Sequence, residues 1–306
     1  MLAIISHEEC LYHDAGEYHP DTAERLRAIN NQIIMSGLDF VVRHYDAPLA
    51  TREQLALAHD RAYVDRVFEM APETGSVEID GDTVMSPGTL NAALRSAGSG
   101  ILGVDLIMAD EANPVFCSVR PPGHHAEYAK AMGFCLFDNI AVAARHALEN
   151  HGLERIAIVD FDVHHGNGTE DIFKDDERVL FCSSFQHPFY PYTGHEAETK
   201  NLVDVPLPSG TQGPAFRKAI REHWIPRLEA FKPQFLFISA GFDAHVLDDM
   251  SNLHLQESDY AWLTSELNEI AREYCGSRIL SMLEGGYEPG ALARSVVAHL
   301  KTLLAV

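Results

Sequence analysis

The sequence predicts an α/β fold in which a mostly parallel central sheet is flanked by helices on both faces. Short runs rich in valine, isoleucine and phenylalanine alternate with longer helical patterns along nearly the whole chain, an order that is typical of a wound parallel sheet. Most of these runs are continuously apolar rather than alternating, as expected of strands covered on both sides. Because no internal repeat or long Gly/Ser/Pro linker divides the chain, we expect residues 1–306 to form a single domain.

Seven apolar runs are predicted to be strands: Leu2–Ser6, Phe40–Tyr45, Pro114–Ser118, Arg155–Asp160, Arg178–Ser183, Phe235–Ala240 and Arg278–Leu283. Seven intervening stretches have helical patterns: Thr22–Met35, Asp60–Met70, Gly88–Ala109, Asn139–Asn150, Pro214–Ala230, Ser258–Tyr274 and Pro289–Leu303. Pro214 and Pro289 suit the first turn of a helix, where a backbone N–H has no partner to lose. Ligands of such sheets bind beyond the carboxyl ends of the strands, so the chemistry is expected there.

The composition is that of a protein with a substantial core. Of the 306 residues, 46% are hydrophobic and 22% are charged, which excludes a disordered tail or a collagen-like rod. Basic residues number 23 and acidic residues 45, giving a formal charge of −22. This charge argues against a nucleic-acid partner, whose phosphates would be repelled. It is compatible with a cationic substrate, but many soluble proteins are acidic for solubility alone.

The cysteines and the N-terminus indicate a cytoplasmic protein. The five cysteines are odd in number and none lie in a C-x-x-C spacing, so the disulfide framework of a secreted protein is not expected. The first residues, MLAIISHEEC, lack the basic and apolar regions of a signal peptide. No apolar run is long enough to span a bilayer. We therefore expect no membrane partner, while assembly into a homo-oligomer stays open.

Polar clusters follow four of the predicted strands. They read RPPGHHA over residues 120–126, DFDVHHGNGT over 160–169, GFDAH over 241–245 and EGGY over 284–287. Alternate residues of an extended backbone point the same way, so Asp160, Asp162 and His164 should converge. With Asp243 from another strand end, two carboxylates and one imidazole would give a metal ion three protein ligands and one open position, the arrangement of a catalytic zinc site. A loop that merely caps the next helix is the alternative for this cluster taken alone.

The remaining polar residues suit proton transfer and charge stabilisation. His124 and His125 follow a rigid Pro-Pro-Gly turn, and two histidines facing a metal-bound water can serve as general base and acid. Each needs an acceptor for its other ring nitrogen, for which Asp160 and Asn167 are the candidates. Tyr287, after two glycines, offers a neutral donor for an oxyanion.

Together these motifs resemble the histone deacetylase family, in particular its class II-like bacterial histone deacetylase-like amidohydrolases. The resemblance spans most of the chain and rests on His19-Pro20, Arg25-Leu26, RPPGHHA, Gly133-Phe134-Cys135 with Asn139, DFDVHHGNGT, SAGFDAH and LEGGY. It implies a single-domain arginase–deacetylase fold. It also implies a zinc-dependent hydrolase that releases acetate, or another acyl group, from the ε-amine of lysine in a protein or peptide.

The resemblance assigns a role to each matching residue. One zinc ion would be carried by Asp162, His164 and Asp243. His125, held by Asn167, would transfer protons, while His124, held by Asp160, would orient the water and Tyr287 would polarise the acetyl carbonyl. A potassium ion near the zinc would be held by Asp160, Asp162, the His164 backbone, Ser183 and Ser184. Substrate would contact the aromatic walls Phe134 and Tyr190, together with Gly133, Gly286, Met250 and Asp82.

Departures from the family pattern bear on the substrate. After Asp243 many members read Gly-Asp-Pro, whereas residues 246–250 here read VLDDM. Met250 falls where acetylpolyamine-specific relatives place a glutamate for a second ammonium, and a thioether offers no such charge. Acyl-lysine is therefore favoured, with an acetylpolyamine amidohydrolase as the alternative. A binuclear manganese ureohydrolase would need aspartates at Gly166 and His245, and a non-catalytic binder would not need every catalytic position filled.

Overall fold

The computed structural model describes residues 1–194 and 200–305. Its centre is an eight-stranded sheet with the order β2-β1-β5-β10-β9-β6-β7-β8, and all neighbouring strands in it are parallel. The strands are β1 Ala3–Ser6, β2 Arg43–Asp46, β5 Val115–Cys117, β6 Ile156–Asp160, β7 Val179–Gln186, β8 Leu202–Leu207, β9 Leu236–Ala240 and β10 Ile279–Leu283. The predicted fold class is confirmed.

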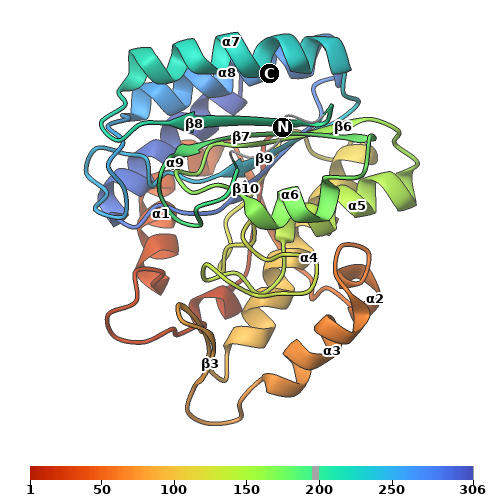
Figure 1. The fold of residues 1–306 in the computed structure, drawn as a ribbon, viewed down its shortest axis with the longest axis vertical. Helices are drawn as coiled ribbons and strands as arrows, with labels where there is room; N and C mark the ends of the chain where they lie inside the picture. Colours follow the sequence, from red (N-terminus) through yellow and green to blue (C-terminus); the bar gives the residue numbers. More distant parts are fainter. Residues whose placement is uncertain (195–199, 306) are drawn as a thin grey trace.

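Helices cover both faces of this sheet (Figure 1). One layer contains α1 Ala23–Met35, α7 Gly213–Phe231, α8 Glu257–Tyr274 and α9 Pro289–Leu303, and the other contains α4 Thr89–Met108, α5 Asn139–His151 and α6 Asn167–Phe173. The central strands β6, β9 and β10 are buried along their whole length, which explains their continuous apolar pattern. Pro214 and Pro289 lie in the first turns of α7 and α9, as predicted.

A smaller part of the chain extends away from the sheet. It contains the short helix α2 Arg52–Leu55, the helix α3 Arg61–Met70 and an antiparallel hairpin of β3 Val77–Asp80 and β4 Thr83–Met85, and it lies at the end of the molecule opposite α7 (Figure 1). Two short 3-10 turns, Glu8–Leu11 and Leu38–Phe40, are also present among the described residues.

All seven predicted strands and all seven predicted helices are present, with bounds that differ by a few residues. The sequence prediction missed the edge strand β8, the hairpin strands β3 and β4, and the short helices α2 and α6. β8 contains Asp204 and Pro206, and a proline that cannot donate to a ladder is tolerated at a sheet edge. Among the described residues, no helix is both long and apolar enough to cross a membrane.

Candidate functional site

Three donor side chains meet just beyond the carboxyl ends of two neighbouring strands. Asp162 and His164 follow β6, and Asp243 follows β9. The Nδ1 atom of His164 lies 3.0 Å from Oδ1 of Asp162 and 3.2 Å from Oδ2 of Asp243, and the three ligand atoms lie within 4.8 Å of one another. All three residues are buried. The D-x-D-x-H spacing and the parallel sheet thus bring together the residues expected to form one metal site.

The chemistry of this cluster fits a divalent cation. Burial and the neighbouring Asp162 raise the pKa of Asp243 to about 7, because two carboxylates held together away from water repel each other. The Oδ2 atom of Asp243 is buried and accepts no hydrogen bond from the described residues. A cation among the three donors would neutralise the carboxylates and give this oxygen a partner, with two oxygens and one nitrogen as a suitable ligand set for zinc.

Two glycines shape the space around the carboxylates. A Cβ atom at Gly285 would lie 2.5 Å from Oδ2 of Asp162 and closer still to Oδ2 of Asp243. A Cβ atom at Gly241 would lie 2.5 Å from Cβ of Asp162. The Gly285 N–H donates to Oδ2 of Asp162 at 2.8 Å. The glycines of the GFDAH and EGGY motifs are therefore required by the close approach of backbone to the donor cluster.

The paired histidines lie beside this cluster, each held by a different acceptor. The Nδ1 atom of His124 is 2.8 Å from Oδ2 of Asp160, and Nδ1 of His125 is 2.8 Å from Oδ1 of Asn167. The Asn167 amide is oriented by its Nδ2, which donates to Oε1 of Glu127 at 2.9 Å. Because Oδ1 of Asn167 can only accept, Nδ1 of His125 carries the proton and its Nε2 is left to act as a base.

The two imidazoles have opposite pKa shifts although their ring centroids are only 4.0 Å apart. Burial opposes the protonation of His124, but Asp160 and Asp162 outweigh it and raise its pKa well above the ordinary value. Burial, His124 and His164 together lower the pKa of His125 well below the ordinary value. The acceptors and neighbours of the two rings therefore act in opposite directions, favouring a proton on His124 and disfavouring one on His125.

Tyr287 is positioned by contacts to its backbone and its ring. Oδ2 of Asp248 accepts the Tyr287 N–H at 2.6 Å, and the Arg25 guanidinium lies 4.8 Å from the centre of the tyrosine ring. Burial and the nearby carboxylates raise the pKa of the Tyr287 phenol well above its ordinary value, although Arg25 opposes this shift. The phenol therefore stays protonated and can donate a hydrogen bond.

Arg25 belongs to a buried network that starts near the N-terminus. Its Nη1 donates to Oδ1 of Asp21 at 2.6 Å and its Nε to the Gly286 carbonyl at 2.6 Å, and a further nitrogen donates to the Glu284 carbonyl. Arg120 also donates to Oδ1 of Asp21, at 2.8 Å. The two guanidinium groups outweigh burial and hold the pKa of Asp21 well below its usual range. Gly286 thus serves this network through its carbonyl.

A cavity of about 430 Å³ opens above the donor cluster. It is lined by Asp82, His125, Gly133, Phe134, His164, Phe189, Tyr190, Asp249, Met250 and Tyr287. The ring of Phe134 stands edge-on to Tyr287 at 5.9 Å, and that of Tyr190 stands edge-on to His125 at 5.3 Å. Aromatic walls around a polar floor suit an unbranched apolar stem that ends in a polar group.

The residues expected to hold potassium lie on adjoining strand ends. Asp160 and Ser183 are register partners in β6 and β7. Oδ1 of Asp160 accepts the Asp162 N–H at 3.0 Å, and the Ser183 hydroxyl lies 3.2 Å from Nδ1 of His165. The Ser184 hydroxyl is buried without a hydrogen-bond partner among the described residues. This orphaned oxygen is compatible with a cation ligand.

Most of the site residues predicted from the sequence lie together beyond the carboxyl ends of the parallel strands. Gly286 is the exception among the expected substrate contacts, because it is absent from the cavity lining and faces Arg25. Sequence reasoning missed Phe189, which stacks on His164 with ring centroids 5.6 Å apart, and it missed Asp248 and Asp249 as site residues. Phe189 directly precedes Tyr190 in an aromatic and proline-rich stretch, and this neighbour is the sequence feature that could have identified Phe189 as a site residue.

The fold and the site are those of an amide hydrolase, and comparison with known proteins identifies the family. The model of the histone deacetylase domain matches residues 19–303, so the chain belongs to the histone deacetylase family. It is 33% identical to the histone deacetylase-like amidohydrolase of Pseudomonas aeruginosa, over 93% of this chain and 81% of that protein. It is 34% identical to human polyamine deacetylase HDAC10, over 99% of this chain and 48% of that protein.

A solved structure confirms the arginase–deacetylase fold. The crystal structure of the HDA15 HD domain superimposes with a TM-score of 0.93 and 32% sequence identity, covering 99% of this chain and 88% of that one. The resemblance recognised in the sequence is thereby confirmed at the level of family, fold and amide hydrolysis.

Proposed function

We propose that this protein is a zinc-dependent deacetylase that hydrolyses N-ε-acetyl-lysine, or a related acyl-lysine, to lysine and a carboxylate. The observation that carries the proposal is the convergence of a buried donor cluster, the Asn167-bonded His125 and Tyr287 at one cavity. Asp162, His164 and Asp243 would hold the zinc ion, which when bound supplies Lewis acidity for water and for the amide carbonyl.

Proton transfer and charge stabilisation are carried out by side chains of this protein. His125 accepts a proton from the attacking water at Nε2, while its Nδ1–H stays bonded to Asn167. The cationic His124, held by Asp160, favours negative charge on the water. Tyr287 donates its phenol proton in a hydrogen bond to the oxygen that gains charge. His125 then returns its proton to the leaving amine as the C–N bond breaks.

The shape of the cavity supports acyl-lysine as substrate. Phe134 and Tyr190 flank a passage that leads to the donor cluster, and such walls fit the methylene stem of lysine. Met250 and Asp82 also line the cavity, where Met250 offers an apolar contact and Asp82 a carboxylate for a substrate backbone. Asp82 is already engaged through Oδ1, which accepts the Gly133 N–H at 3.1 Å.

An acetylpolyamine is the second candidate substrate, and the acidity of the mouth favours it. Asp82 and Asp249 both line the cavity, and a second ammonium of a polyamine would be attracted to these carboxylates. The overall charge of −22 acts in the same direction. The human relative named polyamine deacetylase supports keeping this candidate.

A substrate panel distinguishes the two candidates. The purified protein is assayed for kcat/KM on acetyl-lysine peptides, longer acyl-lysine peptides, acetylputrescine and acetylspermidine. The proposal expects the highest value on an acyl-lysine peptide, and a clear preference for acetylpolyamines would replace it by the second candidate. Asp249→Asn should lower kcat/KM selectively on acetylpolyamines, while Asp175→Asn, at an exposed position remote from the cavity, is the matched control.

We also propose a cytoplasmic location and a single catalytic domain over residues 1–306. All five cysteines are buried free thiols, which is typical of a protein kept in a reducing compartment. A potassium ion held by Asp160, Asp162, the His164 backbone, Ser183 and Ser184 completes the proposed cofactors. Atomic emission analysis of the protein dialysed against potassium and against sodium tests that part.

A further inference from the structure

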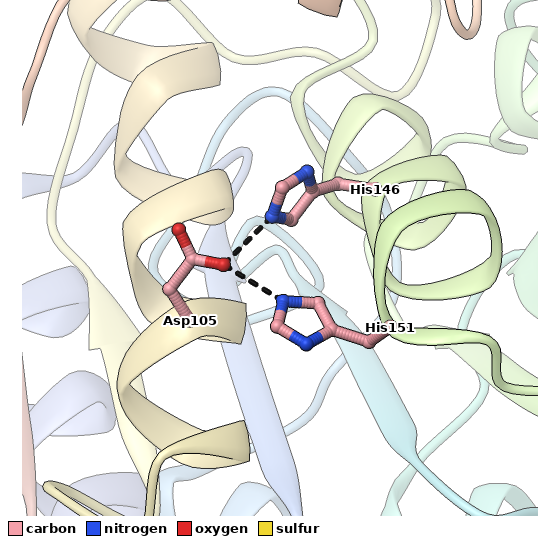
Figure 2. A group of neighbouring side chains, drawn as sticks. All are labelled: Asp105, His146 and His151. Carbon is pink, nitrogen blue, oxygen red and sulfur yellow. Dashed lines mark hydrogen bonds and ion pairs between the residues drawn. The ribbon is translucent and has the colours of Figure 1, made fainter.

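A second cluster of metal-ligating side chains lies between two helices on one face of the sheet. Asp105 is in the last turn of α4, and His146 and His151 are in the last two turns of α5. Figure 2 shows both imidazoles pointing at the carboxylate from the facing helix. Their Nε2 atoms lie 2.7 and 2.8 Å from the same oxygen, Oδ1 of Asp105.

The geometry of the cluster is that of a chelate. The two histidine rings are 5.2 Å apart at an interplanar angle of 78°, so their Nε2 atoms approach one point from two directions. All three ligand atoms lie within 4.8 Å of one another. Two imidazole nitrogens and one carboxylate oxygen are ligands that zinc and its neighbours in the first transition row accept.

Helix packing builds this arrangement. Gly100 lets α4 approach α5 closely, since a Cβ atom there would lie 2.8 Å from Cβ of Ala143. Both helices run back across the sheet in the same direction, toward the starts of β5 and β6. Their C-terminal ends therefore lie together, and the negative ends of two helix dipoles favour a cation there.

The cluster is open to solvent on one side. The Asp105 side chain is 50% exposed, that of His151 25% and that of His146 9%. A cation could enter from solvent and keep water in a remaining position. The cluster lies near the amino-terminal ends of β5 and β6, whereas Asp162, His164 and Asp243 lie beyond the carboxyl ends of β6 and β9. This site is therefore separate from the candidate catalytic centre.

We propose that Asp105, His146 and His151 form a second site for a divalent transition metal, with zinc as the best match. Bound there, the ion links the last turn of α4 to the end of α5. It therefore stabilises the helix layer without taking part in the hydrolysis.

The test is a metal titration of the full chain. Metal-stripped protein is titrated with Zn²⁺ by calorimetry, and the bound metal is counted by atomic emission after dialysis. Wild type is expected to bind two equivalents, and Asp105→Asn and the double variant His146→Ala/His151→Ala one equivalent each. Excess Zn²⁺ should raise the Tm of wild type further than that of either variant, because a ligand that binds only the native state stabilises it.

Control variants separate this site from the catalytic one. His223→Ala removes an exposed histidine on α7 and should keep both equivalents. Asp105→Asn should bind one equivalent fewer than wild type, and this difference in metal content can be measured whether or not the proposed deacetylase activity is correct. Any turnover that wild type shows should be unchanged in this variant. His151→Gln, at the more exposed ligand, covers the case in which the double variant fails to fold. Equal numbers of bound equivalents in wild type, Asp105→Asn and His151→Gln would show a hydrogen-bonded cluster only and overturn the proposal.

Discussion

Gly285→Ala is the most demanding test of the metal cluster, because a single methyl group would touch two of its ligands. The added Cβ atom would lie 2.5 Å from Oδ2 of Asp162 and closer to Oδ2 of Asp243, whereas ordinary contacts begin at 3.4 Å. Asp162 alone must therefore move by about 3.4 − 2.5 = 0.9 Å. Metal–ligand distances tolerate only about 0.2 Å, and a misplacement of about 1 Å at a reacting centre costs about 10²-fold in rate.

We expect Gly285→Ala to lose the metal equivalent bound by Asp162, His164 and Asp243, and at least about 10²-fold in kcat/KM. An ion at Asp105 should be kept. Metal content is measured by atomic emission, turnover on the best substrate of the panel, and folding by circular dichroism. Gly81→Ala is the matched control, because a Cβ atom at Gly81 meets nothing within 4 Å. A folded Gly285→Ala protein with normal metal content and normal turnover would refute the assignment of Asp162 and Asp243 as ligands.

Three further predictions concern other residues. Tyr287→Phe should lower kcat by about 10²- to 10³-fold, as loss of an oxyanion donor does, with unchanged metal content; near-normal turnover would remove Tyr287 from its role. Met250→Glu should raise kcat/KM on acetylspermidine relative to an acetyl-lysine peptide by about two- to fivefold, the size of a partly screened ion pair, and an unchanged ratio would contradict the placement of Met250 at the mouth. Burial lowers the pKa of His299 to about 3. As the pH falls below about 6.5, this histidine therefore becomes protonated in the unfolded chain but stays neutral in the native state. The free energy of unfolding should then decrease as the pH is lowered, by up to about 1.4 kcal/mol per pH unit for this residue. In urea titrations His299→Gln should show a smaller dependence on pH, and an identical dependence would contradict this role of His299.

The sequence was sufficient for those parts of the fold in which local pattern and final environment agree. The strands β6, β9 and β10 are buried on both faces, so they are apolar throughout and easy to recognise. β8 pairs with β7 alone, and its exposed edge tolerates Asp204 and Pro206. Those two residues removed the apolar signal on which the prediction depended.

The same distinction applies to the candidate site. Asp162, His164 and Asp243 lie in short motifs directly after strands, so a parallel sheet alone predicts their proximity. Asp248 and Phe189 come from loops whose paths no periodicity specifies. The roles of Gly241 and Gly285 depend on how closely two backbones approach the carboxylates, a property that emerges only when the strands are assembled.

The buried pairing of Asp21 with Arg25 and Arg120 has a consequence for how the protein can be shortened. Arg25 reaches across the chain to the carbonyls of Glu284 and Gly286 and lies against the Tyr287 ring. A fragment that starts after residue 25 would retain every proposed zinc ligand and both paired histidines. The segment that carries Tyr287 would nevertheless lose its contacts with Arg25. Protein engineers who trim termini should therefore treat the first helix as part of the reaction machinery, although it carries no group that reacts.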